Sequence, residues 1–188
     1  MTSDKLLVGL TGMAGSGKSI VVKIAAQDGY GVIAMGDEVR DEAKRRNLAS
    51  TPEKLGRIML ELRQTEGDAV MAKRCITKID KTAKQRIIID GIRSLSEVEE
   101  FKKRFRNFSL VTVHSSPETR FRRIYDRQRS DDSQDWRTFR ERDLRELSVG
   151  LGNAIAMAEY VIVNEGSPES AKAQARRILR RVEAKWMK

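Results

Sequence analysis

The sequence predicts an α/β fold in which a five-stranded parallel sheet is covered by helices on both faces. Three observations support this prediction: five short apolar runs, a helical pattern between successive runs, and a glycine-rich segment directly after the first run. Strands that alternate with helices along a chain pair in parallel and place the helices on both sides of the sheet. The length of 188 residues fits a single domain spanning residues 1–188.

The expected elements follow one another in a regular order. We expect strands at residues 5–10, 31–35, 86–90, 108–114 and 160–163, which are short and rich in apolar side chains. We expect helices at residues 17–28, 37–47, 52–81 with a break near Gly67, 96–106, 117–129, 136–158 and 168–188. The segments Ser116-Pro117-Glu118 and Ser167-Pro168-Glu169 are typical helix starts, because each joins a cap, a first-turn proline and an acid.

The composition excludes several classes of protein. Charged residues make up 34% of the chain and hydrophobic residues 39%, a balance typical of globular proteins rather than disordered ones. No apolar run approaches the roughly 18 residues that a membrane helix needs, and the first residues do not read as a signal peptide. We therefore expect a cytoplasmic protein without a membrane partner. One cysteine and one histidine argue against a zinc site, and Cys75 is expected to be a small buried residue.

Positive charge is concentrated at the carboxyl terminus. The formal net charge is +10, and residues 172–188 hold seven Lys or Arg residues and one acid. A basic helix of this kind can contact RNA or a membrane surface. The alternative that we favour is the solvated face of an amphipathic helix, so RNA is not the preferred partner.

The strongest motif lies at residues 12–19, which read GMAGSGKS and fit the pattern G-x-x-x-x-G-K-[ST]. Its glycines let successive backbone N–H groups face one phosphate, the lysine reaches the terminal phosphates, and the serine hydroxyl is a ligand for Mg²⁺. The motif lies between an expected strand and an expected helix, as this mechanism requires. We assign ATP binding to Gly12, Met13, Ala14, Gly15, Ser16, Gly17, Lys18 and Ser19, and Mg²⁺ binding to Ser19.

Charged residues follow the second and third expected strands. Asp37 and Arg40 come after one strand, and Asp90 and Arg93 after the next. The carboxyl ends of parallel strands meet at one edge of the sheet, so these residues are expected near the phosphate loop. The arginines fit an anionic acceptor and the Asp90 carboxylate fits the shell of a magnesium ion. The alternatives are a helix cap for Asp37, a turn residue for Asp90 and surface positions for both arginines.

Nine arginines and no lysine lie between residues 120 and 145. Negative charge spreads over the phosphoryl oxygens during transfer, so several arginines that close over this group stabilise the transition state. The alternative is a pair of solvated, salt-bridged helices, since six acids lie among the arginines. We interpret residues 127–140 as a short lid and residues 37–81 as a helical insert that binds the acceptor.

These motifs resemble, in the correct order, those of the nucleoside monophosphate kinases, especially adenylate and cytidylate kinases. Residues 36–40 (GDEVR) are similar to the family pattern G-D-x-[LI]-R, and residues 90–93 (DGIR) to D-G-[FY]-P-R without its proline. Residues 123–127 (RIYDR) resemble R-[IL]-x-x-R, and Arg129 with Arg140 resembles the lid pattern R-x-D-D followed by a distant arginine. The short lid also resembles that of dephospho-coenzyme A kinases. An archaeal branch of these kinases shares the IDGIRS segment and the segment VIVN at residues 161–164, a resemblance that implies no particular acceptor.

The resemblance implies roles for particular residues. Arg123 would lie over the adenine and Asn164 would border it, while Asp37, Arg40 and Arg93 would bind the acceptor. Catalysis would rest on Lys18, Arg93, Arg127, Arg129 and Arg140. We therefore expect an ATP- and Mg²⁺-dependent phosphotransferase that acts on a nucleoside monophosphate or dephospho-coenzyme A. The alternatives are a P-loop NTPase with a regulatory or RNA-binding role and a kinase of RNA ends.

Overall fold

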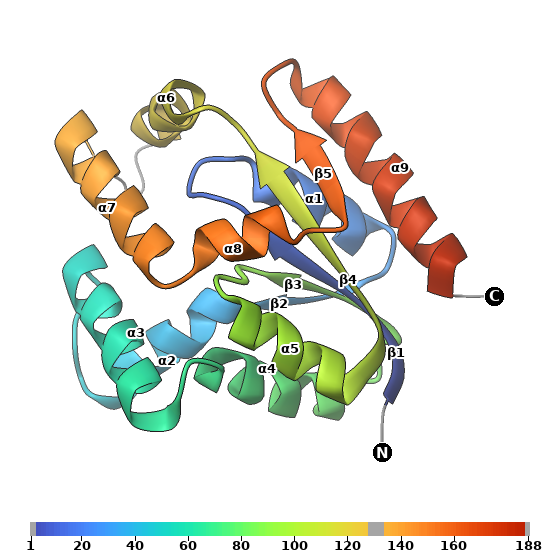
Figure 1. Ribbon diagram of the computed structural model, residues 1–188, viewed down its shortest axis with the longest axis horizontal. Coiled ribbons are helices and arrows are strands. Elements are labelled where there is room, and N and C mark those ends of the chain that lie inside the picture. The colour runs from blue at the N-terminus through green and yellow to red at the C-terminus, as the bar shows by residue number, and fades with distance from the viewer. Residues whose placement is uncertain (1–2, 128–133, 187–188) are drawn as a thin grey trace.

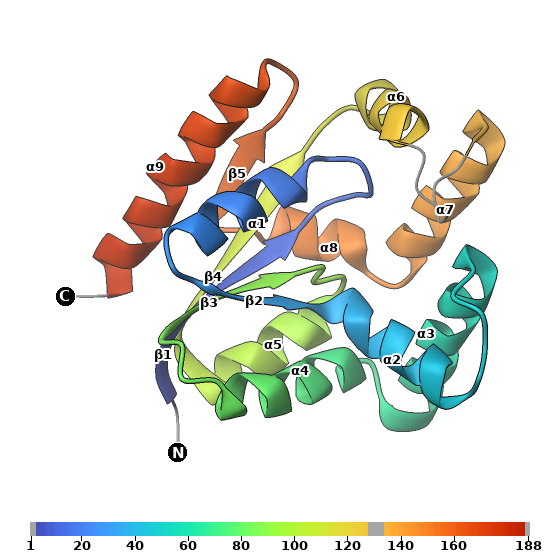
Figure 2. The same cartoon turned by 180° about the vertical axis from the view of Figure 1, so that it is seen from behind.

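The computed structural model describes residues 3–127 and 134–186, and these form a three-layer α/β fold (Figures 1 and 2). The five strands are all parallel and their order across the sheet is β2-β3-β1-β4-β5. This confirms the predicted sheet. The strands are β1 (Ser3–Thr11), β2 (Gly31–Ala34), β3 (Arg86–Asp90), β4 (Phe105–His114) and β5 (Tyr160–Val163).

Helices cover both faces of the sheet and its carboxyl edge. Figure 2 shows α1 (Lys18–Gln27) and α9 (Pro168–Trp186) on one face, and Figure 1 shows α5 (Leu95–Arg104) and α8 (Leu151–Ala156) on the other. The α4 helix (Val70–Lys81) packs beside α5. The α6 (Pro117–Arg127) and α7 (Trp136–Ser148) helices lie near the edge to which β4 points, and α2 (Met35–Arg45) and α3 (Pro52–Glu66) flank that edge.

The central strand separates two hydrophobic cores. Leu6, Val8 and Leu10 of β1 point toward α1 and α9, whereas Leu7 points toward the α4 and α5 side. Successive side chains of a strand face opposite sides of the sheet, so one apolar strand contributes to both cores. The phosphate loop, residues 12–19, directly follows the carboxyl end of β1.

Two helices begin earlier than the sequence predicts. The α2 helix starts at Met35, so Asp37 lies inside its first turn and does not cap it; Ala34 holds the cap position. The α5 helix starts at Leu95, because Ser94 and Glu97 form a capping box that the prediction missed. This helix ends at Arg104 and β4 begins at Phe105, whose side chain is buried in the core.

The range 37–81 is divided among three helices. The break near Gly67 is confirmed, since α3 ends at Glu66 and α4 begins at Val70. The α4 helix buries Cys75 and Ile79 against strand residues, so it belongs to the layer that covers the sheet. The α2 and α3 helices extend beyond this layer toward α7 (Figure 1).

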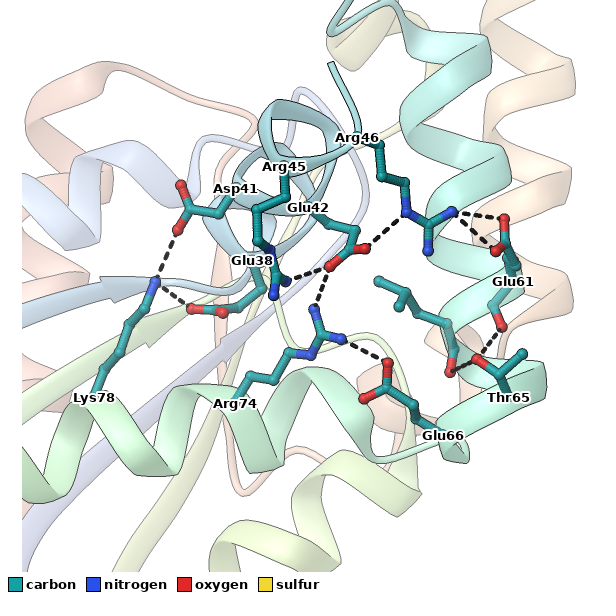
Figure 3. Close-up of polar contacts among 11 residues, drawn as sticks. Glu38, Asp41, Glu42, Arg45, Arg46, Glu61, Thr65, Glu66, Arg74 and Lys78 are labelled. Carbon is teal, nitrogen blue, oxygen red and sulfur yellow. Dashed lines mark hydrogen bonds and ion pairs between the residues drawn. The ribbon is translucent and has the colours of Figure 1, made fainter. Parts of the chain in front are cut away.

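A network of charged side chains joins these three helices (Figure 3). The carboxylate of Glu42 on α2 accepts hydrogen bonds from Nε of Arg46 at 2.7 Å and from Nη1 of Arg74 on α4 at 3.0 Å. Arg46 also contacts Glu61 on α3, and Arg74 contacts Glu66 at the end of α3. The hydrogen bond from Arg46 is the main cause that lowers the pKa of Glu42. The network therefore links α3 to α2 and α4.

The basic carboxyl-terminal segment forms α9 as an amphipathic helix. Its buried residues are Ala171, Ala175, Ile178, Leu179 and Val182, and its exposed arginines are Arg176, Arg177, Arg180 and Arg181. This matches the favoured alternative of a solvated helix face. None of the helices in the described ranges has the length and apolar character needed to cross a membrane.

The buried thiol of Cys75 gives a test of the α4 core. The side chain is fully buried, and burial raises the pKa of the thiol to about 12. We expect no reaction with a disulfide reagent such as DTNB at pH 8 in the folded state, and one reactive thiol per chain in urea. Glutathione, whose thiol titrates normally, is the control. Rapid stoichiometric labelling of the folded protein would contradict the placement of α4.

Candidate active site

A cleft with a volume of about 630 Å³ opens at the carboxyl edge of the sheet. It is lined by the phosphate loop, by the ends of β2 and β3, by α6 and α7, and by the loop after β5. The predicted site residues that line it are Gly12, Ala14, Gly15, Gly17, Lys18, Ser19, Arg40, Asp90, Arg93, Arg123, Arg127 and Asn164. Segments that are distant in the sequence are thus brought to one cavity.

The phosphate loop adopts a conformation that its glycines require. Gly15 and Gly17 have φ angles of 80° and 97°, in the left-handed region that L side chains rarely adopt. A Cβ atom on Gly17 would lie 2.1 Å from Nδ2 of Asn164. The loop leads directly into α1, whose amino terminus faces the cleft and favours anions. Met13 and Ser16 do not line the cleft, although they belong to the same loop.

The side chain of Lys18 lies folded across its own loop. Its Nζ donates hydrogen bonds to the carbonyl oxygens of Gly12 at 2.5 Å and Met13 at 3.1 Å. Burial lowers the pKa of Lys18, while Asp90 and Glu146 oppose this shift. A phosphate that enters the cleft would compete with two neutral carbonyls for this ammonium group.

The residues that would hold magnesium fit that ion. Ser19 and Asp90 both line the cleft, and Oδ1 of Asp90 is buried without a hydrogen-bond partner. An unsatisfied buried carboxylate oxygen is suited to a hydrated cation. Within the part of the chain that the structure describes, no cluster of three or more acids, histidines or cysteines could enclose a metal. The arrangement therefore fits a Mg²⁺ ion that is held largely by phosphate oxygens and water.

Arg123 and Asn164 connect α6 and the end of β5 to the phosphate loop. Nη2 of Arg123 donates to the carbonyl oxygen of Asn164 at 2.9 Å, and Nδ2 of Asn164 donates to the carbonyl oxygen of Ser16 at 2.9 Å. Nη1 of Arg123 also donates to Oγ of Ser115. Both residues line the cleft, and Asn164 is buried.

A smaller cavity of about 140 Å³ adjoins the cleft between α2, α3 and α7. Its apolar wall is formed by Val39, Leu55 and Met59. Its charged lining residues are Arg40, Arg93, Arg142, Arg145 and Glu146. Asp37 lines neither cavity, because its carboxylate turns outward and pairs with Arg40, whose Nε lies 3.1 Å from Oδ1.

The α7 helix supplies three residues that the sequence analysis missed. Arg142, Arg145 and Glu146 share one face of α7 and line the smaller cavity. Arg140 is exposed and lines neither cavity. Arg145 and Glu146 lie three and four residues after Arg142, and this spacing is the sequence signal for a common helix face. Arg129 lies outside the described residues.

Glu97 positions the Arg93 loop although the proline of the resembling motif is missing. Oε2 of Glu97 accepts hydrogen bonds from the backbone N–H of Arg93 at 2.7 Å and of Ser94 at 3.2 Å. Oε1 accepts a hydrogen bond from Nη2 of Arg63 on α3 at 2.5 Å. Gly91 begins the turn with a φ of 101°. The buried Arg63–Glu97 pair thus anchors α3 to the segment that carries Arg93.

A second buried ion pair joins α6, α7 and the phosphate loop. Nη1 and Nη2 of Arg120 donate to Asp143 at 2.9 and 2.6 Å, and Nη1 also donates to the carbonyl oxygen of Ala14 at 3.1 Å. The guanidinium lies 4.9 Å from the centre of the Phe139 ring. Asp143 follows Arg142 on α7, so this pair sets the position of the α7 residues relative to the phosphate loop.

Replacement of Asp143 tests this coupling. We expect Asp143→Asn to lower the free energy of unfolding by about 3 kcal/mol, because a buried guanidinium loses its charged partner. We also expect weaker ATP binding, because Arg120 holds the carbonyl of Ala14. Urea unfolding and nucleotide titration measure the two effects. Glu141→Gln, at an exposed position on the same helix, is the control, and equal unfolding curves for both variants would refute the coupling.

Solved structures with a similar fold include two kinases. TT1252 from Thermus thermophilus is 19% identical with a TM-score of 0.61, covering 94% of this chain and 97% of that chain. A shikimate kinase from Acinetobacter baumannii is 18% identical with a TM-score of 0.53, covering 98% and 96%. A gluconokinase from Sinorhizobium meliloti is 14% identical with a TM-score of 0.56, covering 98% and 99%. At these identities the likeness shows a P-loop kinase-like fold alone.

Sequence relatives extend over nearly the whole chain. Residues 11–140 match the family described as an AAA domain. The UPF0200 protein of Methanothermobacter thermautotrophicus is 45% identical over 182 residues, which cover 97% of this chain and 93% of the relative. The UPF0200 protein of Hyperthermus butylicus is 46% identical over 180 residues, 96% of each chain. The chain therefore belongs to the AAA domain family and to the UPF0200 proteins of archaea.

Proposed function

We propose that this protein is a cytoplasmic, ATP- and Mg²⁺-dependent phosphotransferase that acts on a nucleotide-like, phosphate-bearing acceptor. The observation that carries the proposal is that two cavities adjoin each other and share lining residues. The cleft over the phosphate loop and the smaller cavity share Arg40, Arg93 and Arg142 among their lining residues. A donor and an acceptor bound in them would meet at these arginines.

The donor side rests on the phosphate loop. Backbone N–H groups at the start of α1 and the ammonium group of Lys18 would hold the phosphates of ATP. Arg123 and Asn164 would border the base, as in the nucleoside monophosphate kinases that the motifs resemble. Mg²⁺, when bound through Ser19 and near Asp90, would neutralise charge on the terminal phosphates.

The acceptor side rests on charge and on an apolar wall. The smaller cavity offers four guanidinium groups and one carboxylate beside Val39, Leu55 and Met59. Guanidinium groups bind phosphate in a bidentate manner, and the apolar wall suits a base or another flat group. Nucleoside monophosphates and dephospho-coenzyme A both combine these features. Within the described ranges, no observation favours an RNA-binding role for α9.

Phosphoryl transfer needs positioning and charge more than it needs covalent chemistry. The cleft in which the transferred group would lie is lined by Lys18, Arg93, Arg127 and Arg142. They would stabilise the charge that spreads over its equatorial oxygens. The α7 helix would also exclude water from this part of the cleft, which limits the hydrolysis of ATP.

An acceptor screen with ATP and Mg²⁺ tests the proposal. We expect phosphorylation of at least one compound among AMP, CMP, UMP, GMP and dephospho-coenzyme A, with slow hydrolysis until this compound is added. Replacement of Lys18 by Ala should lower the rate by roughly 10²-fold or more, because a charged contact to the reacting phosphates is lost.

A matched lysine provides the control for this screen. Lys23 lies on the same helix as Lys18 but is exposed and lines neither cavity. Lys23→Ala should retain the wild-type rate. Phosphoryl transfer that survives in Lys18→Ala at the rate of Lys23→Ala would contradict the proposed function.

A further inference from the structure

One acidic side chain stands at the junction of the two cavities. The residues that line both are Gly36, Arg40, Arg93, Arg142 and Glu146, and Glu146 is the acid among them. Its side chain comes from the last turns of α7 and is buried. Asp90 lines the cleft but not the smaller cavity, and Asp37 lines neither. An acceptor atom that moves from the smaller cavity toward a phosphate in the cleft would therefore pass this shared set of residues, which includes Glu146.

The positive charges around Glu146 favour the ionised form of its carboxyl group. Burial raises the pKa of Glu146, but the combined charges of Arg93, Arg142 and Lys18 outweigh this effect and lower it. The ion pairs themselves are loose, with 3.8 Å from Oε1 to Nη2 of Arg93 and 3.7 Å to Nε of Arg142. Hydrogen bonds to carboxylates are about 2.7–2.9 Å long, so Glu146 is not hydrogen-bonded through these contacts. It retains capacity to accept a hydrogen bond from a ligand.

A negative charge at this place distinguishes between two kinds of attacking group. An oxygen of an acceptor phosphate carries negative charge and would be repelled by a carboxylate. A hydroxyl group would instead donate a hydrogen bond to it, and that bond would strengthen as the oxygen attacks. The four arginines do not make this distinction, because they attract any anionic part of the acceptor.

We infer that the acceptor reacts through a hydroxyl group, and that Glu146 is the catalytic residue that receives the hydrogen bond and the proton of this hydroxyl. The inference rests on the proposed phosphotransferase function. The hydroxyl oxygen forms a bond to the γ-phosphorus, and the bond from this phosphorus to the β–γ bridging oxygen breaks. ADP leaves with that oxygen, and the hydroxyl proton passes to Glu146 and then to solvent. The acceptor becomes a phosphate monoester.

The other residues of the smaller cavity would then bind the parts of the acceptor that do not react. Arg145, which lines the smaller cavity but not the cleft, would hold an anionic group of the acceptor at a distance from its reacting hydroxyl. Val39, Leu55 and Met59 would pack against its apolar part. The substrate class is thus an anionic molecule with a free hydroxyl and a flat or apolar body, such as a nucleotide phosphorylated on its sugar.

The position of phosphorylation on a probe tests the inference directly. AMP and CMP carry both a terminal phosphate and ribose hydroxyls, and dephospho-coenzyme A carries hydroxyls but no terminal phosphate. We expect ³¹P NMR to show a new phosphate monoester on the accepting probe. A nucleoside diphosphate product would overturn the inference and leave the proposed function intact. No transfer to any probe, with hydrolysis of ATP unaffected by the probes, would overturn both.

Replacement of Glu146 supplies a second test. It also applies to the hydrolysis of ATP, in which water is the attacking group. We expect Glu146→Gln to lower kcat for ester formation, and the slow hydrolysis of ATP, by roughly 10²-fold or more, with KM for ATP unchanged. If the attacking group were a phosphate, loss of the negative charge would raise the rate instead. An unchanged or raised kcat would overturn the role of Glu146.

The matched control is Glu141→Gln on the same helix. Glu141 is exposed, pairs with Arg137 and lines neither cavity, so this variant should keep the wild-type kcat. Equal losses in both variants would show that a general effect of α7, rather than the carboxylate of Glu146, is responsible, and would overturn the assignment.

Discussion

The buried contact of Arg120 with Asp143 and with the carbonyl of Ala14 fixes the relation between the phosphate loop and α7. The phosphate loop follows β1. Its glycines allow its backbone conformation, and Asn164 donates a hydrogen bond to its backbone. The α7 helix has no strand to position it and depends on this ion pair, on the packing of Phe139 and on its connection to α8. Because Arg142, Arg145 and Glu146 all belong to α7, this buried pair helps to set their positions relative to the phosphate loop.

Two buried ion pairs thus connect helices to the loops at the carboxyl edge of the sheet. Arg120 and Asp143 link α7 to the phosphate loop, and Arg63 and Glu97 link α3 to the segment that carries Arg93. Buried pairs contribute little net stability against apolar replacements, but their geometry is demanding. Their place beside the two cavities is therefore better explained by the positioning of charged groups than by stability.

Much of this arrangement could be predicted from the sequence. The apolar runs gave β3 and β5 with their observed bounds, and the motifs after β2 and β3 brought Arg40, Asp90 and Arg93 to the cleft. The prediction was less successful on α7, where Arg140 is exposed and Arg142 lines both cavities. Arg140 and Arg142 are two residues apart, so they point in directions about 200° apart around the helix axis. Which of them faces the cavities depends on how tertiary contacts orient α7. Glu146 was missed because its spacing from Arg142 indicates a shared helix face but not that this face is buried.

We propose that the donor and the acceptor meet at the junction marked by Arg93, Arg142 and Glu146. A crystal structure with a non-hydrolysable ATP analogue and Mg²⁺ would locate the γ-phosphate. We expect it at this junction, with Lys18 moved from the carbonyls of Gly12 and Met13 onto the phosphates. A γ-phosphate bound away from the junction, or Lys18 still on those carbonyls, would refute this meeting point.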